Sequence, residues 1–135
     1  MDRLFFRLGA LSALVSVAAG AFGAHALRVR LTPEHLATFE TAARYQMYHA
    51  LGLMAIGWAI TRWPGPLPVW AGWLFVVGTV LFSGSLYLLA LTGVRWWGAV
   101  TPLGGVAFLT GWVCLALSVR RRTQTEEVRA LRQAH

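Results

Sequence analysis

Hydrophobic residues in this chain fall into four long runs, separated by short segments rich in arginine, proline and tryptophan. The runs extend from Leu4 to Leu27, Tyr45 to Ile60, Leu67 to Leu91 and Trp97 to Val119, and the second is the shortest. A helix needs about 20 mostly apolar residues to cross a hydrocarbon core of roughly 30 Å. The pattern therefore predicts an all-α, polytopic membrane protein with four transmembrane helices.

The predicted organisation is a single domain with a short extension. Residues 1–122 are expected to form a four-helix transmembrane bundle, and residues 123–135 a polar C-terminal tail. In the tail, Thr123 and Glu126 have the spacing of a capping box, which favours a short surface helix. The connections between the runs are too short for a soluble domain, so any function must reside in the bundle, its rims or its partners.

Local signals predict a helix start between the first two runs. Thr32 is a suitable N-cap, Pro33 suits the first helical position, and Glu34 suits the positive end of the helix dipole. Leu36 and Phe39 follow on one face of this helix. The pattern predicts an interfacial, amphipathic helical segment that leads into the second span.

Prolines mark two further boundaries. The segment from Trp63 to Pro68 contains three alternating prolines, which cannot continue a helix and predict a tight hairpin. Thr101 and Pro102 again resemble an N-cap followed by a first-turn proline. They predict that the fourth helix begins near Pro102.

The charge distribution excludes one class of function and predicts an orientation. The net charge is +7, but the arginines flank apolar runs instead of covering one soluble face, which argues against nucleic-acid binding. Four spans place both termini on one side of the membrane. That side would carry Arg3, Arg7, Arg62, Arg120, Arg121 and Arg122, against Arg28, Arg30, Arg44 and Arg95 on the other. Because arginine-rich loops remain cytoplasmic, both termini are predicted to be cytoplasmic.

The most concentrated polar chemistry lies near the start of the second run. Tyr45, Tyr48 and His49 occupy neighbouring positions on one helical face, and His25 lies near the end of the first run. If the first two helices pack together, the two imidazoles could meet at one rim. Such a site could bind copper, zinc or haem, or hydrogen-bond a quinone headgroup. The alternative is structural: His25, Arg44, Gln46 and the tyrosines bond one another and fix this corner.

Small residues predict where helices approach one another closely. Glycine and serine within membrane helices permit close packing and interhelical hydrogen bonds. The predicted packing positions are Ser12, Ser16, Gly20, Ser83, Gly84, Ser85, Gly104 and Gly111. A second interpretation is a homo-oligomeric channel or transporter for an anion or neutral solute. Its path would be lined by Ser83, Ser85, Tyr87 and Thr101.

Acidic residues are absent from all four apolar runs. A proton-coupled cation exporter typically needs an intramembrane carboxylate, so that class is disfavoured. The sequence also contains no nucleophile paired with a base and no phosphate-binding loop. An enzyme is therefore the class that the residues support least, and no particular cofactor is indicated.

Four ordered motifs resemble one known family. They span Gly20 to Leu27, Arg44 to Leu51, Leu81 to Gly93 and Thr101 to Gly105. The chain resembles the small bacterial inner-membrane proteins of domain-of-unknown-function family 423, to which a mitochondrial transmembrane protein of animals is similar. The resemblance implies a multi-pass protein of the bacterial inner membrane, and it implies no established activity.

The sequence favours a role that depends on partners. The first hypothesis is an accessory or assembly subunit of a larger membrane complex, and analogy with the mitochondrial protein favours a respiratory complex. The expected partners are the lipid bilayer and either another membrane protein or further copies of this chain. The cofactor-, metal- or quinone-binding rim and the channel are the alternatives.

Overall fold

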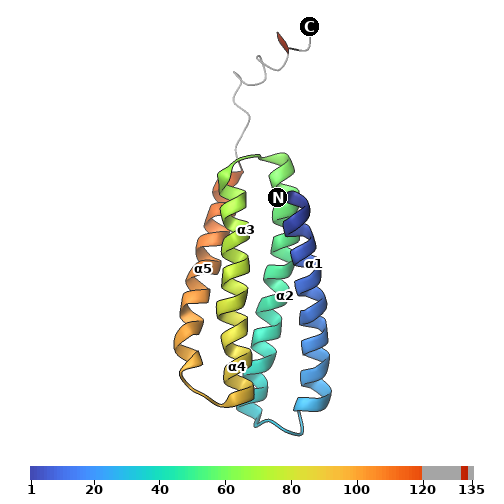
Figure 1. Cartoon of the computed structure of the whole chain (residues 1–135), viewed down its shortest axis with the longest axis vertical. Helices are drawn as coiled ribbons and strands as arrows, with labels where there is room; N and C mark the ends of the chain where they lie inside the picture. Colours follow the sequence, from blue (N-terminus) through green and yellow to red (C-terminus); the bar gives the residue numbers. More distant parts are fainter. Residues whose placement is uncertain (120–131, 134–135) are drawn as a thin grey trace.

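The computed structural model describes residues 1–119 and 132–133, and all regular secondary structure in residues 1–119 is helical. Helix α1 (Asp2–Phe22) continues into the π-helical turn η1 (Gly23–Leu27), and α2 (Pro33–Arg62) follows. Helix α3 (Pro66–Gly78), the π-helical turn η2 (Thr79–Ser83) and α4 (Gly84–Thr92) form one continuous rod, and α5 (Trp97–Ser118) is the last helix of this region. These rods lie side by side and alternate in direction (Figure 1).

Three of the rods are long and apolar enough to cross a membrane: Asp2–Leu27, Pro66–Thr92 and Trp97–Ser118. Helix α2 is the longest at 30 residues, but it does not meet the same apolar criterion within the described part of the chain. Its first turns carry Glu34, Glu40 and Arg44. The all-helical fold and three apolar rods are thus observed, whereas a fourth membrane crossing remains a prediction.

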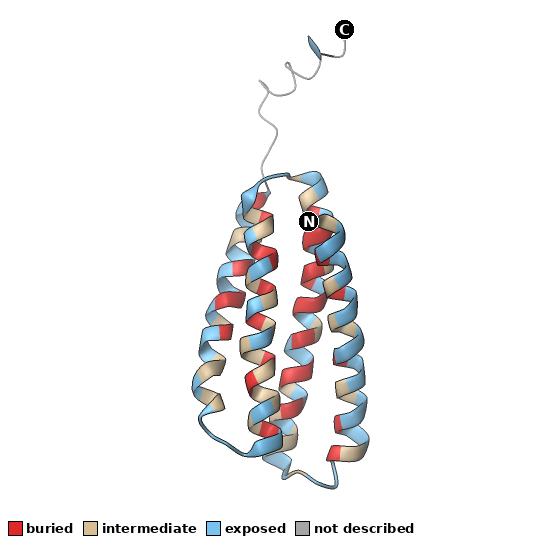
Figure 2. Ribbon diagram, in the orientation of Figure 1, coloured by how far each residue is buried: buried red, intermediate tan, exposed pale blue. Residues whose placement is uncertain are grey.

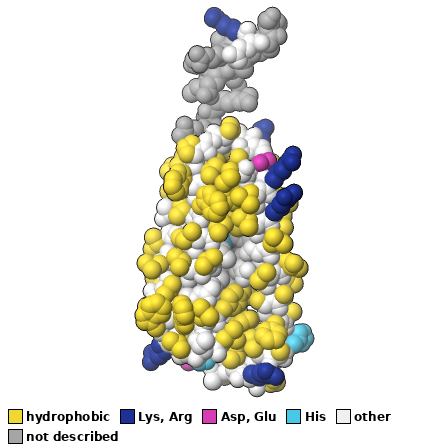
Figure 3. Space-filling model, viewed as in Figure 1, with side chains coloured by type: hydrophobic (Ala, Val, Ile, Leu, Met, Phe, Trp, Pro, Cys, Tyr) yellow, Lys and Arg dark blue, Asp and Glu magenta, His cyan; other side chains and the backbone are white. Residues whose placement is uncertain are grey.

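Hydrophobic side chains cover the middle of the molecule, and arginine side chains gather towards its two ends (Figure 3). Many large apolar residues on this surface are more than half exposed, including Leu14, Val80 and Leu109. A soluble protein rarely exposes so much continuous apolar surface. The distribution fits a body whose middle lies in hydrocarbon.

Two of the predicted boundaries are confirmed. Thr32 caps α2, since its hydroxyl oxygen accepts from the His35 amide at 3.2 Å and Pro33 is the first helical residue. Only residues 63–65 separate α2 from α3, which makes the predicted tight hairpin.

At the opposite end of the molecule, Gly93 terminates α4. Its φ is 70°, a left-handed conformation that glycine adopts without strain.

The predicted start of the last helix near Pro102 is wrong. Helix α5 begins at Trp97, and Pro102 lies inside it. The amides of Gly98 and Ala99 already bond to the carbonyls of Arg95 and Trp96, at 3.0 and 2.9 Å. These bonds nucleate a turn before the proline, so the proline removes one backbone bond without ending the helix.

The predicted interfacial segment is not observed as a separate element. It forms the first turns of the continuous helix α2 (Figure 1). Phe39 is buried in a cluster with Leu27 and Ala90, which are contributed by η1 and α4. Packing against both neighbours therefore holds this part of α2 in line with the rest of the helix. The predicted tail helix at Thr123 to Glu126 lies outside the described residues.

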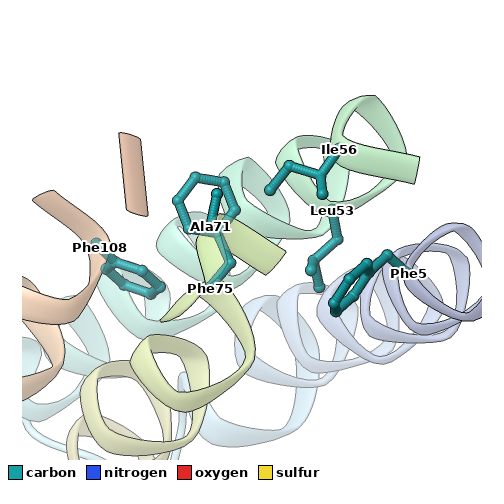
Figure 4. Packing of buried hydrophobic residues seen from close by; sticks show 6 residues of the cluster. All are labelled: Phe5, Leu53, Ile56, Ala71, Phe75 and Phe108. Atoms are coloured by element: carbon teal, nitrogen blue, oxygen red, sulfur yellow. The ribbon is translucent and has the colours of Figure 1, made fainter. Parts of the chain in front are cut away.

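Helix α2 is the most buried of the rods (Figure 2). The main core cluster consists of Phe5, Leu53, Ile56, Ala71, Phe75 and Phe108, drawn in Figure 4. Glycines receive the aromatic rings: a Cβ atom at Gly72 would lie 2.5 Å from Phe5 Cζ, and one at Gly52 would lie 2.6 Å from Phe75 Cε2. Ring-to-glycine packing therefore sets how closely α1, α2 and α3 approach.

Candidate functional site

Gln46 is the centre of a hydrogen-bond network that joins three helices. Its side chain is only 7% exposed. The Nε2 group donates to the backbone and hydroxyl oxygens of Ser12 on α1, both at 3.3 Å. The Oε1 atom accepts from the Tyr87 hydroxyl on α4 at 2.7 Å. A buried amide must satisfy both ends, and this arrangement does so with one partner from each side.

Two serines bind the backbone of α2 one turn before Gln46. Ser16 on α1 donates to the Ala43 carbonyl at 2.6 Å, and Ser83 on η2 donates to the Ala42 carbonyl at 2.8 Å. A helical carbonyl has a second lone pair, so each can accept this additional bond. Ser16 and Ser83 thus fix the heights of α1 and the α3–α4 rod against α2.

His49 is held by both ring nitrogens and by aromatic rings. Trp112 Nε1 on α5 donates to His49 Nε2 at 3.2 Å. An indole N–H only donates, so Nε2 is the acceptor, and Nδ1 carries the hydrogen that faces the Tyr45 carbonyl at 2.8 Å. The imidazole stacks on Phe108 with ring centroids 3.3 Å apart and meets Phe75 edge-on. In this arrangement no ring nitrogen of His49 is left to bind a metal.

The structure does not bring His25 together with His49. His25 is exposed in η1, where the neighbouring Gly23 lies against Phe39. His49 is ten residues beyond Phe39 on the same helix, a rise of about 15 Å. Within residues 1–119 and 132–133, no group of three or more His, Cys, Asp or Glu side chains is placed to hold a metal ion. The predicted rim therefore does not form around two histidines.

Tyr45 and Tyr48 do lie beside His49, and both are partly exposed, although the Tyr45 ring also packs on Phe82 with centroids 4.8 Å apart. Their rings contact each other with centroids 5.7 Å apart, and they are 39% and 52% exposed. Neither phenol hydroxyl makes a hydrogen bond to any of the described residues. Tyr48 lies near the midpoint of α2, about 22 Å from either end. We call Tyr45, Tyr48 and the exposed Leu51 the tyrosine face.

The predicted packing positions on α1 differ in their surroundings. Ser12 and Ser16 bond to α2, as described above. A Cβ atom at Gly20 would meet nothing within 4 Å, whereas one at Gly9 would lie 2.6 Å from the Ala50 carbonyl oxygen. Gly9 therefore marks the close approach of α1 and α2, although it is not among the packing positions predicted from the sequence.

The later packing positions also separate into two kinds. A Cβ atom at Gly104 would overlap the Phe82 backbone nitrogen, and one at Gly111 would lie 2.7 Å from Phe75. Gly84, in contrast, faces open space. Gly104 and Gly111 are thus points of close contact between α5 and the α3–α4 rod.

The four side chains suggested to line a permeation path are engaged in hydrogen bonds. Ser83 bonds to α2 and Tyr87 to Gln46. Ser85 and Thr101 bond to each other at 2.7 Å, and Ser83 and Ser85 are only 1% and 3% exposed. These hydroxyls hold helices together in the described chain instead of facing a shared opening.

The network on α2 was only partly visible in the sequence. The polar run from Arg44 to His49 indicated that this part of α2 matters, but Gln46 was expected to bond to nearby residues at a corner. Its partners, Ser12 and Tyr87, are 34 and 41 residues away. Trp112 is 63 residues from His49, so the bond between them has no local sequence signal.

Proteins with similar sequences carry membrane-protein names. The family model described as "Protein of unknown function (DUF423)" matches residues 19–105. "UPF0382 membrane protein SH2409" of Staphylococcus haemolyticus is 50% identical over 116 residues, which cover 86% of this chain and 94% of that protein. "UPF0382 membrane protein YwdK" of Bacillus subtilis is 44% identical over 117 residues, covering 86% and 95%. No solved structure matches significantly.

Proposed function

The chain belongs to the DUF423 family of bacterial membrane proteins, and on that basis we propose that it is a four-span inner-membrane protein that acts as an accessory or assembly subunit through a protein partner. The family match agrees with the resemblance carried by the four sequence motifs. The family name supplies no activity. The proposal therefore depends on three features: the topology, the hydrogen-bonded polar groups in the interior of the bundle, and the tyrosine face.

Chain connectivity supports a fourth crossing by α2. The rod Asp2–Leu27 ends at the opposite end of the molecule from the start of α3 at Pro66, and α2 joins the two ends (Figure 1). If the rods on either side cross the membrane, α2 must cross it too. A 30-residue helix is about 45 Å long, so about 15 Å remain outside a 30 Å core. If that excess lies at the start of α2, Glu34 and Glu40 fall within it and Arg44 lies at its inner edge.

Arginine placement supports cytoplasmic termini. The end of the molecule that holds the N-terminus and the end of α5 also carries Arg3, Arg7 and Arg62. In the sequence, Arg120, Arg121 and Arg122 follow the end of α5 after a single residue, Val119. Positively charged segments next to spans stay on the cytoplasmic side, so this end would face the cytoplasm.

The tyrosine face is the observation that carries the partner role. Tyrosine in membrane proteins belongs at the headgroup level, where its hydroxyl reaches water. With α2 crossing the membrane and about 15 Å of its start outside the core, Tyr48 instead lies roughly 8 Å inside the hydrocarbon boundary and is 52% exposed. A phenol without a partner in hydrocarbon costs roughly 2–7 kcal/mol. A neighbouring helix that offers an acceptor at this depth would remove that cost.

The interior of the bundle supports the same conclusion. Gln46, His49, Ser16 and Ser83 are satisfied by interhelical bonds, so their polar groups hold the fold together. Among the described residues, only the Thr79 hydroxyl is buried without a partner. We infer that the occupant of the tyrosine face is a transmembrane helix of another protein with a carbonyl, amide or hydroxyl acceptor at the depth of Tyr48.

Isolation of the protein from its native membrane tests this proposal. The tagged full-length chain is extracted in mild detergent, and the polypeptides that remain at near-stoichiometric ratio are identified by mass spectrometry. The variant Tyr48→Phe removes only the phenol oxygen and is expected to lower the recovered partner about threefold to thirtyfold, as for one interhelical hydrogen bond. Thr110→Val is the matched control, because this exposed hydroxyl already bonds to its own Val106 carbonyl.

Three results would contradict the proposal. Recovery of the chain alone from wild-type membranes would remove the subunit role. Recovery only with further copies of itself would favour the homo-oligomer, and solute flux in liposomes would then support the channel. Equal partner loss in Tyr48→Phe and Thr110→Val would show that the tyrosine face is not the contact.

A further inference from the structure

An open groove lies between the start of α1 and the end of α2, at the proposed cytoplasmic end. It has a volume of about 370 Å³ and is lined by Asp2, Arg3, Phe6, Arg7, Gly57, Trp58 and Thr61. We call it the α1–α2 end groove. Its floor is closed at Gly57, where a Cβ atom would lie 2.8 Å from the Asp2 carbonyl oxygen and 3.2 Å from Phe6 Cβ.

The charged groups at the groove favour an anion. Arg3 and Arg7 are exposed and one helical turn apart, so both guanidinium groups are available on one side of α1. The acidic side chain at the groove, Asp2, pairs with the N-terminal amine at 3.5 Å, the sole ion pair within the described residues. A guanidinium group binds the oxygens of a phosphate through two parallel N–H donors.

The remaining lining is apolar and suits a lipid more than a soluble anion. Phe6 and Trp58 are 50% and 57% exposed, and the Trp58 ring meets Trp63 edge-on at 5.5 Å. Exposed indoles at the end of a span lie at the headgroup level. The Thr61 hydroxyl already donates its hydrogen to the Trp58 carbonyl at 2.7 Å, so that hydrogen is not available to a ligand. The groove therefore has a cationic rim above an aromatic wall, which matches a phosphate attached to an acyl chain.

We propose that the α1–α2 end groove binds the phosphate of an anionic phospholipid through Arg3 and Arg7, with the first part of an acyl chain along Phe6 and Trp58. This inference rests on the membrane placement in the proposed function and not on the accessory role. Anionic lipids line the cytoplasmic leaflet, where basic groups near the surface attract them. The groove concentrates that general attraction at one place.

Native mass spectrometry of the purified full-length protein in non-ionic detergent tests the groove. The protein is titrated with phosphatidylglycerol, with phosphatidylcholine and with inorganic phosphate. The wild type is expected to retain phosphatidylglycerol, and the double variant Arg3→Gln/Arg7→Gln is expected to lose about tenfold or more of this affinity, as for lost charge-assisted bonds. The control Arg28→Gln/Arg30→Gln makes the same charge change at the opposite end and is expected to change binding less than twofold.

The other outcomes each overturn the proposal. Equal loss in the two double variants would indicate general charge attraction without a site. Inorganic phosphate that displaces the lipid at similar concentration would indicate a free-phosphate site. Because Arg3 and Arg7 are exposed, folding should be retained, and the helical circular dichroism signal checks this. Trp58→Ala gives a second measurement: it should weaken retention of the lipid, and unchanged retention would remove the acyl-chain contact. No partner is present, so these results do not depend on the accessory role.

Discussion

The hydroxyl of Tyr87 on α4 donates to Oε1 of Gln46 on α2 over 2.7 Å, and the two residues are 41 positions apart. Through the other end of the same amide, this bond connects α4 to Ser12 on α1. The rod Pro66–Thr92 and the rod Asp2–Leu27 are thereby tied to the central helix by one side chain. Gln46 is accordingly a fixed point in the arrangement of three rods.

Tyr87→Phe should destabilise the protein by about 0.6–2 kcal/mol, because the side-chain oxygen Oε1 of Gln46 loses its hydrogen-bond donor in the interior. The free energy of unfolding in mixed detergent micelles, followed by circular dichroism, measures the loss. Tyr48→Phe removes the same atom from an exposed phenol and should change the free energy of unfolding by less than about 0.5 kcal/mol. A similar loss in both variants would contradict the network.

Gly72→Ala should lower stability by about 1–3 kcal/mol, because the added methyl group would lie 2.5 Å from the Phe5 ring. The same unfolding measurement applies. Gly84→Ala is the control in the same rod, since nothing lies within 4 Å of its added Cβ atom. Alanine is the better helix former, so Gly84→Ala should be neutral or slightly stabilising. Equal destabilisation by both changes would show that ring-to-glycine packing does not limit the helix approach.

The two histidines should respond differently to removal. His49→Ala deletes a buried ring between Phe75, Phe108 and Trp112, and should cost about 2–5 kcal/mol of unfolding free energy. His25→Ala removes an exposed side chain and should cost less than about 0.5 kcal/mol. If the His25 change proved as destabilising as the His49 change, the two residues would share a role that their separation argues against.

The orientation predicts where cysteines can be labelled from outside the cell. In a Cys114→Ser background, Arg30→Cys lies between α1 and α2 and should react with a membrane-impermeant maleimide in intact spheroplasts. Arg62→Cys lies at the opposite end of α2 and should react only after the membrane is opened. If both cysteines reacted in intact spheroplasts, or both reacted only after the membrane was opened, α2 would not cross the membrane. The reverse pattern would place the termini outside.

Sequence alone determined the features that depend on short segments. Apolar run length identified a membrane protein, because the bilayer requires a fixed length of apolar helix. Thr32 and Pro33 fixed the start of α2, since an N-cap and a first-turn proline act on their own backbone. The same reasoning failed at Pro102, where preceding turn bonds had already started the helix. Family membership followed from four motifs that lie in order along the chain.

Only the tertiary structure decided which side chains meet. Whether His25 and His49 share a rim depends on how α1 and α2 are aligned along the bundle axis. In this alignment His49 lies about 15 Å along α2 from Phe39, which packs beside His25's turn η1. Small residues marked faces, but contact depended on helix rotation: Gly9 touches α2 whereas Gly20 faces open space. The bonds from Gln46 to Ser12 and Tyr87, and from Trp112 to His49, arise for the same reason. Helix height and rotation are set by all the packed side chains together, so no local segment encodes them.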